Sequence, residues 1–202
     1  QPDIAHFIHP TLVGTGGLMM AKRLSVPTLA SFHLDLANMA QYFGLGFLEP
    51  VVWWYTRTNF NAADYALAPS RLVQNDMLRH GVRNVGLWRR GVDAEQFHPR
   101  HASTEMRARL SDGHPDDTIL LYVGRLSGEK QIDKIRAVLQ QVPGTRLAVV
   151  GDGPARADLQ AQFAGTPTKF MGYLRGEELW SAFASADIFV FPSALETFGL
   201  VL

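Results

Sequence analysis

The chain alternates throughout between short, largely apolar runs typical of β-strands and longer segments with the period of an α-helix. The strand-like runs lie at residues 4–8, 28–32, 65–68, 85–88, 119–123, 146–150, 169–171 and 188–191. The helical patterns lie between them, at residues 18–24, 48–63, 72–80, 105–110, 131–141, 156–163 and 177–184. Strict alternation of strands and helices predicts an α/β fold whose parallel sheets carry helices on both faces.

One stretch breaks this alternation. Residues 91–103, GVDAEQFHPRHAS, are polar, contain Pro99 and show no period. We therefore expect two Rossmann-like parallel-sheet domains at residues 1–92 and 117–202, joined by a linker with a short helix at 93–116. The chain reaches a strand almost directly after Gln1 and stops early in a helical segment, so we expect an internal piece of a longer protein with both domains incomplete.

Composition excludes several classes of protein. The formal net charge is zero, whereas general nucleic-acid binders carry an excess of basic residues. There is no cysteine, and no cluster of histidines or carboxylates has the spacing of metal ligands. Nothing resembles a signal peptide, and the longest apolar run, at residues 51–55, is too short to cross a bilayer. We expect a cytoplasmic protein.

Two segments that follow strand-like runs carry residues suited to an anionic ligand. VGRLSGEK (123–130) offers Arg125 and Lys130, and ALETFGLVL (194–202) offers Glu196 and a small turn whose backbone amides can face anionic oxygens. In an open α/β sheet such turns lie at the carboxyl edge, where ligands bind. Two cations, free amides and one acid suit a sugar diphosphate.

Each of these residues also has a purely structural explanation. Arg125 and Lys130 could be surface charges, although a cation at a helix start opposes the helix dipole and needs an anion nearby. Glu196 could be a partner of a helix dipole. Asp152, in the sequence VGDGP, is explained by a tight turn.

Taken together, several segments resemble the retaining family-4 glycosyltransferases, and most of all the bacterial sulfoquinovosyltransferases and related lipid glycosyltransferases. The segments are LASFH, WRRGVDAEQFHPR, LLYVGRLSGEK, LAVVGDGP, FMGYLRGEEL and ASADIFVFPSALETFGLVL. The resemblance implies the GT-B fold, in which two Rossmann-like domains face each other. It places residues 1 to about 92 in the acceptor domain and residues from about 117 in the donor domain.

The resemblance also implies roles for single residues. Arg125 and Lys130 would hold the donor diphosphate, Glu196 would bind sugar hydroxyls, and His33, at the end of LASFH, would lie beside the donor sugar. Further donor contacts would come from Gly124, Tyr173, Leu174, Thr197, Phe198, Gly199 and Leu200, of which Tyr173 and Leu174 would face the nucleotide base. After His33, relatives usually carry threonine, whereas Leu34 follows here.

The implied activity is transfer of a sugar from a UDP-linked donor to diacylglycerol or another membrane lipid, with no metal or other cofactor. GDP-mannose-dependent transfer to a lipid or polysaccharide is the alternative, and a non-catalytic sugar-nucleotide binder also fits. A dinucleotide-binding oxidoreductase is a distant alternative. Gly14, Gly16 and Asp35 match its fingerprint in part, but Met19 stands where the third glycine belongs.

Two features indicate contact with a membrane. The segment FLEPVVWWYTR (47–57) is apolar and aromatic, and residues 71–90 contain five arginines against one aspartate. A buried core helix explains the first feature equally well, and a substrate site explains Arg89 and Arg90. We expect peripheral contact with anionic lipid at the inner face of the membrane.

Overall fold

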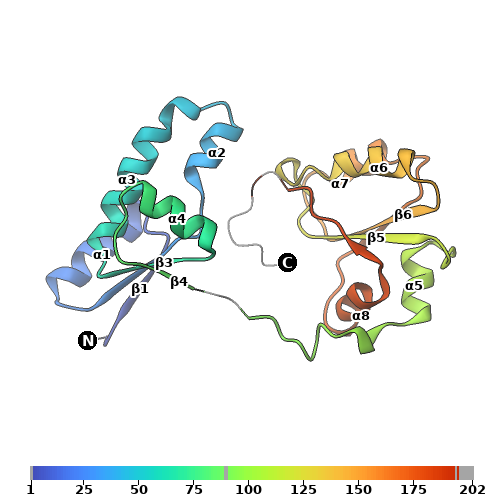
Figure 1. The fold of residues 1–202 in the computed structure, drawn as a ribbon, viewed down its shortest axis with the longest axis horizontal. Coiled ribbons are helices and arrows are strands. Elements are labelled where there is room, and N and C mark those ends of the chain that lie inside the picture. The colour runs from blue at the N-terminus through green and yellow to red at the C-terminus, as the bar shows by residue number, and fades with distance from the viewer. Residues whose placement is uncertain (1, 89–90, 194, 196–202) are drawn as a thin grey trace. The chain divides into compact units, whose positions relative to one another are not determined.

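The computed structural model describes residues 2–88, 91–193 and 195, which form two compact α/β units that divide between Gly91 and Val92 (Figure 1). Each unit contains one four-stranded sheet, and all its strand pairs are parallel. The predicted fold class, α/β with two Rossmann-like parallel-sheet units, is confirmed. The assignment of the units to acceptor and donor stays a prediction.

The sheet of the first unit has the strand order β1-β2-β3-β4. Its strands are β1 (Ala5–Ile8), β2 (Thr28–Ser31), β3 (Tyr65–Ala68) and β4 (Val85–Leu87). Its helices are α1 (Leu12–Arg23), α2 (Leu36–Tyr42), the 3₁₀ turn η1 (Gly46–Leu48), α3 (Glu49–Ala62) and α4 (Arg71–Arg79). Because the strand order follows the chain, every crossover runs in the same direction, and right-handed crossovers then place their helices on one face.

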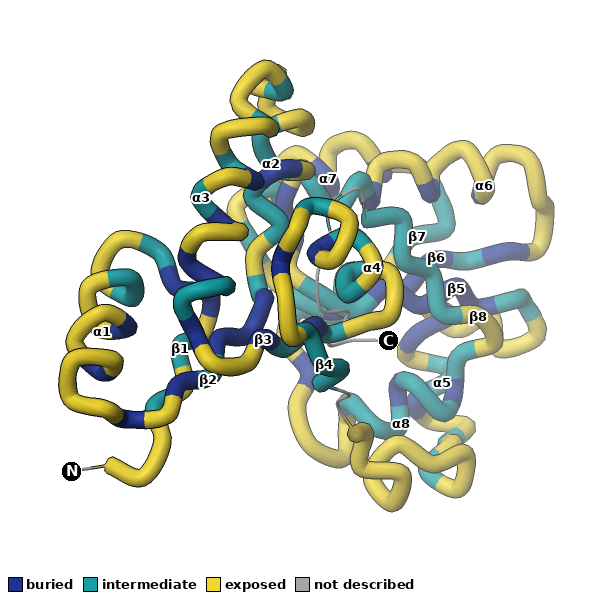
Figure 2. Tube along the Cα trace, turned by 60° about the vertical axis from the view of Figure 1, so that its left-hand side comes forward, coloured by how far each residue is buried: buried dark blue, intermediate teal, exposed yellow. Residues whose placement is uncertain are grey.

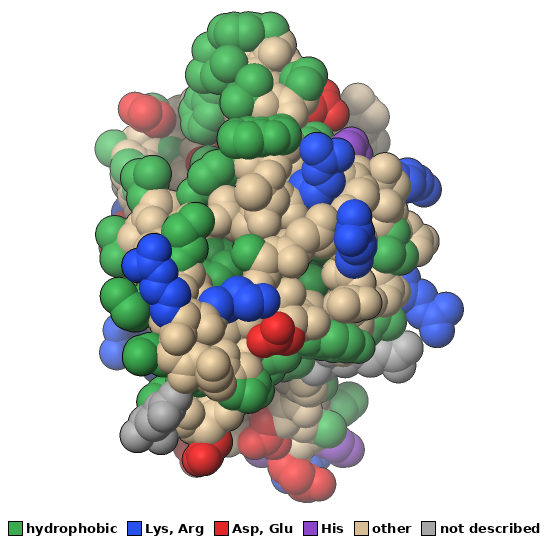
Figure 3. All heavy atoms as spheres, turned by 90° about the vertical axis from the view of Figure 1, so that its left-hand side faces the viewer, with side chains coloured by type: hydrophobic (Ala, Val, Ile, Leu, Met, Phe, Trp, Pro, Cys, Tyr) green, Lys and Arg blue, Asp and Glu red, His purple; other side chains and the backbone are tan. Residues whose placement is uncertain are grey.

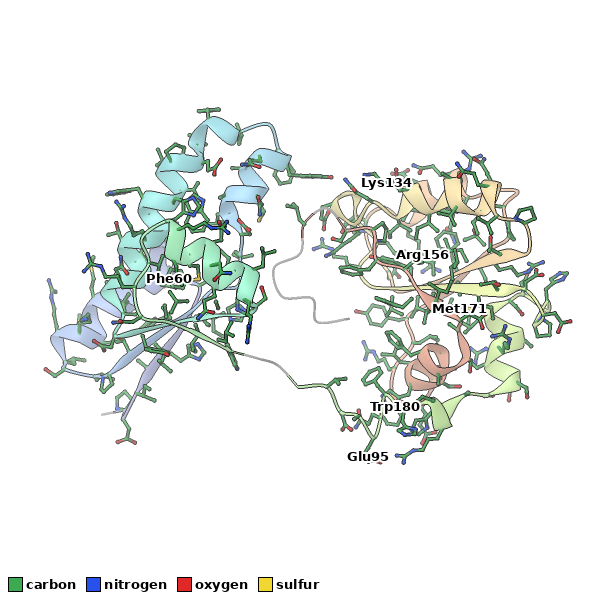
Figure 4. All side chains as sticks on the ribbon, viewed as in Figure 1. Phe60, Glu95, Lys134, Arg156, Met171 and Trp180 are labelled. Atoms are coloured by element: carbon green, nitrogen blue, oxygen red, sulfur yellow. The ribbon has the colours of Figure 1, made fainter. Side chains whose placement is uncertain are left out.

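The core of this unit lies on that face. Leu18 of α1, Phe60 of α3 (labelled in Figure 4) and Met77 of α4 are buried together against Ala30 and Phe32 at the β2 strand. Figure 2 shows buried stretches in dark blue on α1, α3 and β2. Residues at alternate positions on a strand point to the opposite face, where none of the described helices of this unit contributes to the core. The expectation of helices on both faces is therefore wrong for the described part of the first unit.

The sheet of the second unit has the order β7-β6-β5-β8. Its strands are β5 (Thr118–Val123), β6 (Thr145–Val150), β7 (Thr168–Gly172) and β8 (Ile188–Phe189). Its helices are η2 (Pro99–His101), α5 (Thr104–Leu110), η3 (Gly128–Lys130), η4 (Ile132–Lys134), α6 (Ile135–Gln141), α7 (Arg156–Gln162) and α8 (Glu177–Ser185).

Here the chain moves from β5 to β6 and β7 and then returns to the other side of β5 for β8. The return reverses the crossover direction, so α6 and α7 cover one face while α5 and α8 cover the other (Figure 1). Along β5, Leu120 and Tyr122 join the core under α6 and α7, whereas Ile119 and Leu121 join the core with α5 and α8. This unit has helices on both faces, as predicted.

Three local features differ from the prediction. Helix α1 begins at Leu12, six residues before the predicted start at residue 18, and α2 has no counterpart in the predicted pattern. The helix predicted at 131–141 begins only at Ile135, because η3 and η4 precede it and meet at Gln131, whose φ of 51° is left-handed.

Candidate functional site

The loops that follow β5 and β6 run side by side at the carboxyl edge of the second sheet. The Gly124 N–H donates to the Val150 carbonyl oxygen at 3.0 Å. Two glycines permit this approach, because a Cβ on Gly151 would collide with the Gly124 carbonyl oxygen and a Cβ on Gly153 would collide with the backbone of Leu126. The VGR and GDGP motifs therefore form one backbone platform.

A cavity of about 410 Å³ lies at this platform, and four of the predicted donor-binding residues line it: Gly124, Arg125, Tyr173 and Leu174. The Tyr173 side chain is 70% exposed, and the Arg175 guanidinium lies 5.2 Å from the centroid of its ring. The Leu174 side chain is buried in the core, so a ligand in the cavity would meet mainly its backbone.

The strand order of the second sheet reverses at β5, whose neighbours are β6 and β8. In open α/β sheets the ligand-binding crevice lies at such a reversal, outside the carboxyl ends of the strands. Arg125 follows β5 directly, and the Lys130 Nζ lies 5.7 Å from the ring centroid of Phe191, which follows β8. Both predicted cations therefore lie at the reversal point.

The segment after β5 carries Arg125, Glu129 and Lys130. The Ser127 hydroxyl donates to Glu129 Oε1 at 2.5 Å and lowers the pKa of Glu129, and the charges of Lys130 and Arg125 lower it further. A potential that favours a carboxylate also favours a phosphate oxygen. The helix-dipole argument for these cations does not hold, however, because α6 begins only at Ile135 and neither cation lies in its first turn.

The remaining residues predicted to contact the donor lie outside the described residues. They are Glu196, Thr197, Phe198, Gly199 and Leu200. Their roles stay predictions.

His33 follows β2 at the carboxyl edge of the first sheet. Its Nε2 lies 2.9 Å from the Ser31 hydroxyl oxygen, which lies 2.8 Å from Nε2 of His6 on β1. Ser31 is fully buried. The Trp88 ring contacts both imidazoles edge-on, with centroid distances of 5.7 Å to His33 and 5.3 Å to His6.

A third histidine holds the backbone at this edge. Nδ1 of His9 accepts from the backbone N–H groups of His33 and Leu34, each at 3.3 Å. The His9 side chain is buried against Phe32 and Phe60, and this burial lowers its pKa from 6.5 to about 4, with a smaller contribution from the charge of His33. His9 is therefore neutral at neutral pH, which is the state in which Nδ1 can accept an N–H.

The sequence interpretation selected His33 and missed His6, Ser31 and His9. A signal for His9 was present, because it follows the first strand as His33 follows the second, and parallel strands end at the same edge of a sheet. No local signal marks Ser31, whose burial between two histidines follows from strand pairing alone.

The dinucleotide fingerprint can also be compared with the geometry. Gly14 and Gly16 lie inside α1, so they cannot form the phosphate-binding loop that precedes a helix in the dinucleotide fingerprint. Over residues 2–88, 91–193 and 195, no group of three or more histidines and carboxylates is arranged to hold a metal ion. No helix in the same ranges has the length and hydropathy that a bilayer span requires.

Comparison with protein-family models gives two matches. Residues 1–96 match the model described as Glycosyltransferase Family 4, and residues 107–202 match the model described as Glycosyl transferases group 1. The two models together account for both α/β units.

Three curated proteins illustrate the sequence similarity. The chain is 40% identical over 205 residues to sulfoquinovosyl transferase SQD2 of Arabidopsis thaliana, covering 100% of this chain and 40% of that protein. It is 40% identical over 200 residues to a GDP-mannose-dependent alpha-mannosyltransferase of Mycolicibacterium smegmatis, covering 98% and 52%. It is 26% identical over 215 residues to the alpha-monoglucosyldiacylglycerol synthase of Streptococcus pneumoniae, covering 99% and 48%. The chain thus spans about half the length of these relatives.

Among solved structures, Anabaena HepE in complex with UDP and glucose superposes with a TM-score of 0.74. The match covers 98% of this chain and 55% of that one, at 19% sequence identity. At this level of identity the likeness establishes the fold.

Proposed function

The chain belongs to the family-4 glycosyltransferases, and on this premise we propose that it transfers a sugar from a nucleotide-diphosphate sugar to an acceptor. One observation carries the proposal: a cavity lined by Gly124 and Arg125 lies at the point where the strand order of the second sheet reverses. Lys130 adds a second cation at the same point. This is where an open α/β sheet binds a ligand, and two cations at that edge suit a diphosphate.

The chemistry of the proposal is electrostatic. When the bond between sugar and diphosphate breaks, negative charge develops on the leaving nucleotide phosphate. Cations held at that position stabilise the transition state more than the ground state and lower the barrier. We assign this role to Arg125 and Lys130, so that the transfer requires no divalent metal ion.

Three further assignments follow the family resemblance. Glu196 binds sugar hydroxyls, with Thr197, Phe198, Gly199 and Leu200 supplying further donor contacts, and His33 acts on the donor sugar. Tyr173 and Leu174 contact the nucleotide base, which their position in the cavity lining supports. The transfer retains the anomeric configuration, which the coupling constant of the anomeric proton in the product tests directly.

For the substrates we propose a UDP-linked donor and a membrane lipid such as diacylglycerol, with peripheral contact to an anionic membrane. The name of the monoglucosyldiacylglycerol synthase supports the diacylglycerol acceptor. GDP-mannose is the second candidate donor, because a GDP-mannose-dependent relative reaches the same identity of 40%. The full-length protein incubated with a panel of UDP- and GDP-sugars and diacylglycerol decides between them. Consumption of GDP-mannose alone would replace the first candidate by the second.

The two cations give the sharpest test. Arg125→Ala or Lys130→Ala in the full-length enzyme should lower kcat/KM by about a hundredfold, the loss typical of one charge contact in the transition state. The matched control is Lys134→Ala, because the Lys134 side chain is exposed and its Nζ donates to the Gln131 side-chain oxygen at 2.6 Å. Assays in excess chelator test metal independence at the same time. Near-normal rates in both cation variants would exclude the proposed phosphate contacts.

A further inference from the structure

A buried tyrosine ties the loop that carries Arg125 to the core of the second unit. Tyr122, near the end of β5, is fully buried, and its hydroxyl donates to the Arg125 carbonyl oxygen at 3.0 Å. Gly124 makes room for this bond, because a Cβ on Gly124 would lie 2.9 Å from the tyrosine hydroxyl oxygen, closer than a Cβ can approach without a shift of its surroundings. The backbone at Arg125 is therefore held by a side chain of the core.

The residue after Arg125 is fixed as well. The Leu126 side chain is fully buried, its N–H donates to the Asp152 carbonyl oxygen at 3.0 Å, and its carbonyl oxygen accepts the Ala155 N–H at 3.0 Å. Arg125 thus lies between two fixed points, the bond from Tyr122 and the backbone bonds of Leu126. Arg125 itself is exposed, so these bonds hold its backbone and leave its side chain accessible.

A second tie lies just before Lys130. Ser127 is 6% exposed, and its hydroxyl donates to Glu129 Oε1 at 2.5 Å, a distance typical of a bond to an ionised carboxylate. The Ser127 carbonyl oxygen accepts the Lys130 N–H at 3.1 Å, which closes the turn η3. The chain is buried again at Ile132, which is 1% exposed. The backbone that carries the second cation is therefore also held in place.

We propose that Tyr122 and Ser127 are positioning residues that hold the loop of residues 124–131 in its diphosphate-binding conformation before the donor arrives. The proposal rests on the proposed function, in which Arg125 and Lys130 bind the donor diphosphate. Cations that are placed in advance need little reorganisation when charge develops on the leaving phosphate. A loop that becomes ordered only on binding loses binding free energy to that ordering. Both positioning residues act through the backbone, so neither has to contact the ligand.

Hydrogen exchange in the full-length protein without ligand measures how firmly the loop is held. Tyr122→Phe removes the hydroxyl and keeps the buried ring, and it should speed exchange of the Leu126 amide about threefold to tenfold, the effect of one lost hydrogen bond. Ser127→Ala should do the same at the Lys130 amide. Glu129→Gln keeps an acceptor for the serine hydroxyl and should retain most of the protection. Wild-type exchange at both amides in Tyr122→Phe and Ser127→Ala would overturn the proposal.

The matched control is Thr145→Val. Thr145 is 8% exposed and its hydroxyl donates to the Val142 carbonyl oxygen at 2.6 Å, so it makes the same kind of bond in the same unit. It lies at the start of β6, at the opposite end of the strand from Val150 in the cavity lining. Valine keeps the branched shape without the hydroxyl. The variant should leave exchange at Leu126 and Lys130 unchanged.

Ligand binding then separates positioning from stability. Inorganic pyrophosphate carries no base, so it tests the loop whichever nucleotide the donor contains. Tyr122→Phe and Ser127→Ala should each weaken pyrophosphate binding about threefold to tenfold and lower kcat/KM for the nucleotide sugar by a similar factor. The KM for the acceptor should not change, and Thr145→Val should bind pyrophosphate like the wild type.

The outcomes distinguish this proposal from the proposed function. Faster exchange combined with wild-type pyrophosphate affinity and wild-type kcat/KM in both variants would overturn the role of Tyr122 and Ser127 in donor binding. If the wild-type protein bound neither pyrophosphate nor a nucleotide sugar, the proposed function would fail, whereas the exchange rates would still decide whether the two residues hold the loop.

Discussion

His9 combines three properties that a histidine seldom combines without a structural reason. Its side chain is 6% exposed, its φ of 48° is left-handed, and its Nδ1 accepts two backbone N–H groups from the segment that begins with His33. Non-glycine residues adopt this backbone region rarely and mostly where local bonds compensate. A protonated His9 could not accept these bonds, so the carboxyl edge of the first sheet depends on a neutral imidazole.

The depressed pKa predicts acid sensitivity of the first unit. Its folded pKa of about 4 lies below the ordinary histidine value of 6.5, so the unfolded state binds the proton more tightly. The stability due to neutral His9 is complete above pH 6.5 and is lost as the pH falls toward 4. The total loss is about 3 kcal/mol. Urea unfolding in a Trp180→Phe background measures it, because the other three tryptophans lie in the first unit.

His9→Asn provides the comparison, because asparagine tolerates a positive φ and does not titrate in this range. The variant should be less stable at pH 7.5 but should lose less stability between pH 6.5 and 4 than the wild type. Parallel pH dependences in the two proteins would assign the acid sensitivity to another group.

At the level of elements, strand alternation predicted both sheets, and the rule that ligands bind at the carboxyl edge selected Arg125. Arg125 lines one cavity with Gly124, Tyr173 and Leu174, which the family resemblance selected. The features that could not be predicted depend on where a helix begins and on the backbone conformation of single residues. The early start of α1 includes Gly14 and Gly16, which sequence patterns assign to loops. Gln131 has a left-handed φ, and α6 begins only after it. The residue type of Gln131 does not indicate that conformation.

The contact between the β5 and β6 loops yields a prediction at this scale. Gly151 has a φ of +132°, and an added Cβ would overlap the Gly124 carbonyl oxygen. Gly151→Ala should therefore destabilise the second unit by about 2 kcal/mol or more and abolish donor binding. Gly128→Ala is the control, because open space surrounds the added methyl group and no positive φ is required. Thermal unfolding and titration with UDP measure both effects. Equal stability of the two variants would contradict the loop geometry.

The net charge of the whole chain is zero, but apolar and cationic side chains are unevenly distributed over the surface of the first unit. Phe47, Val51 and Trp54 are 76%, 59% and 58% exposed and follow each other at helical spacing along η1 and α3. In Figure 3, hydrophobic side chains gather at the top of the face shown, and lysines and arginines lie below them. Trp53 by contrast is 7% exposed and stacks on His80 at 3.8 Å, so only one of the two adjacent tryptophans is a core residue.

Cations lie next to this apolar stripe. A hollow of about 360 Å³ is lined by Trp54, Arg57 and Arg79, among others, and neither arginine has an ion-pair partner among the described residues. Of the five arginines predicted to attract anionic lipid, Arg89 and Arg90 lie outside the described residues. An exposed aromatic stripe beside unpaired arginines is the arrangement that favours the interface of an anionic membrane.

The last prediction follows from this combination of apolar and cationic surface. Full-length protein should sediment with vesicles that contain phosphatidylserine at low salt, and less at high salt, because screening removes the contribution of about 1 kcal/mol per arginine. Arg57→Gln with Arg79→Gln should weaken low-salt binding about tenfold or more, and Phe47→Ser with Trp54→Ser should weaken binding at both salt concentrations. Leu72→Ser is the matched control, since Leu72 is 76% exposed on α4 but lies outside the η1–α3 stripe. If the wild-type protein stays in the supernatant at both salt concentrations, the lipid acceptor loses its main physical support and a soluble acceptor becomes the better hypothesis.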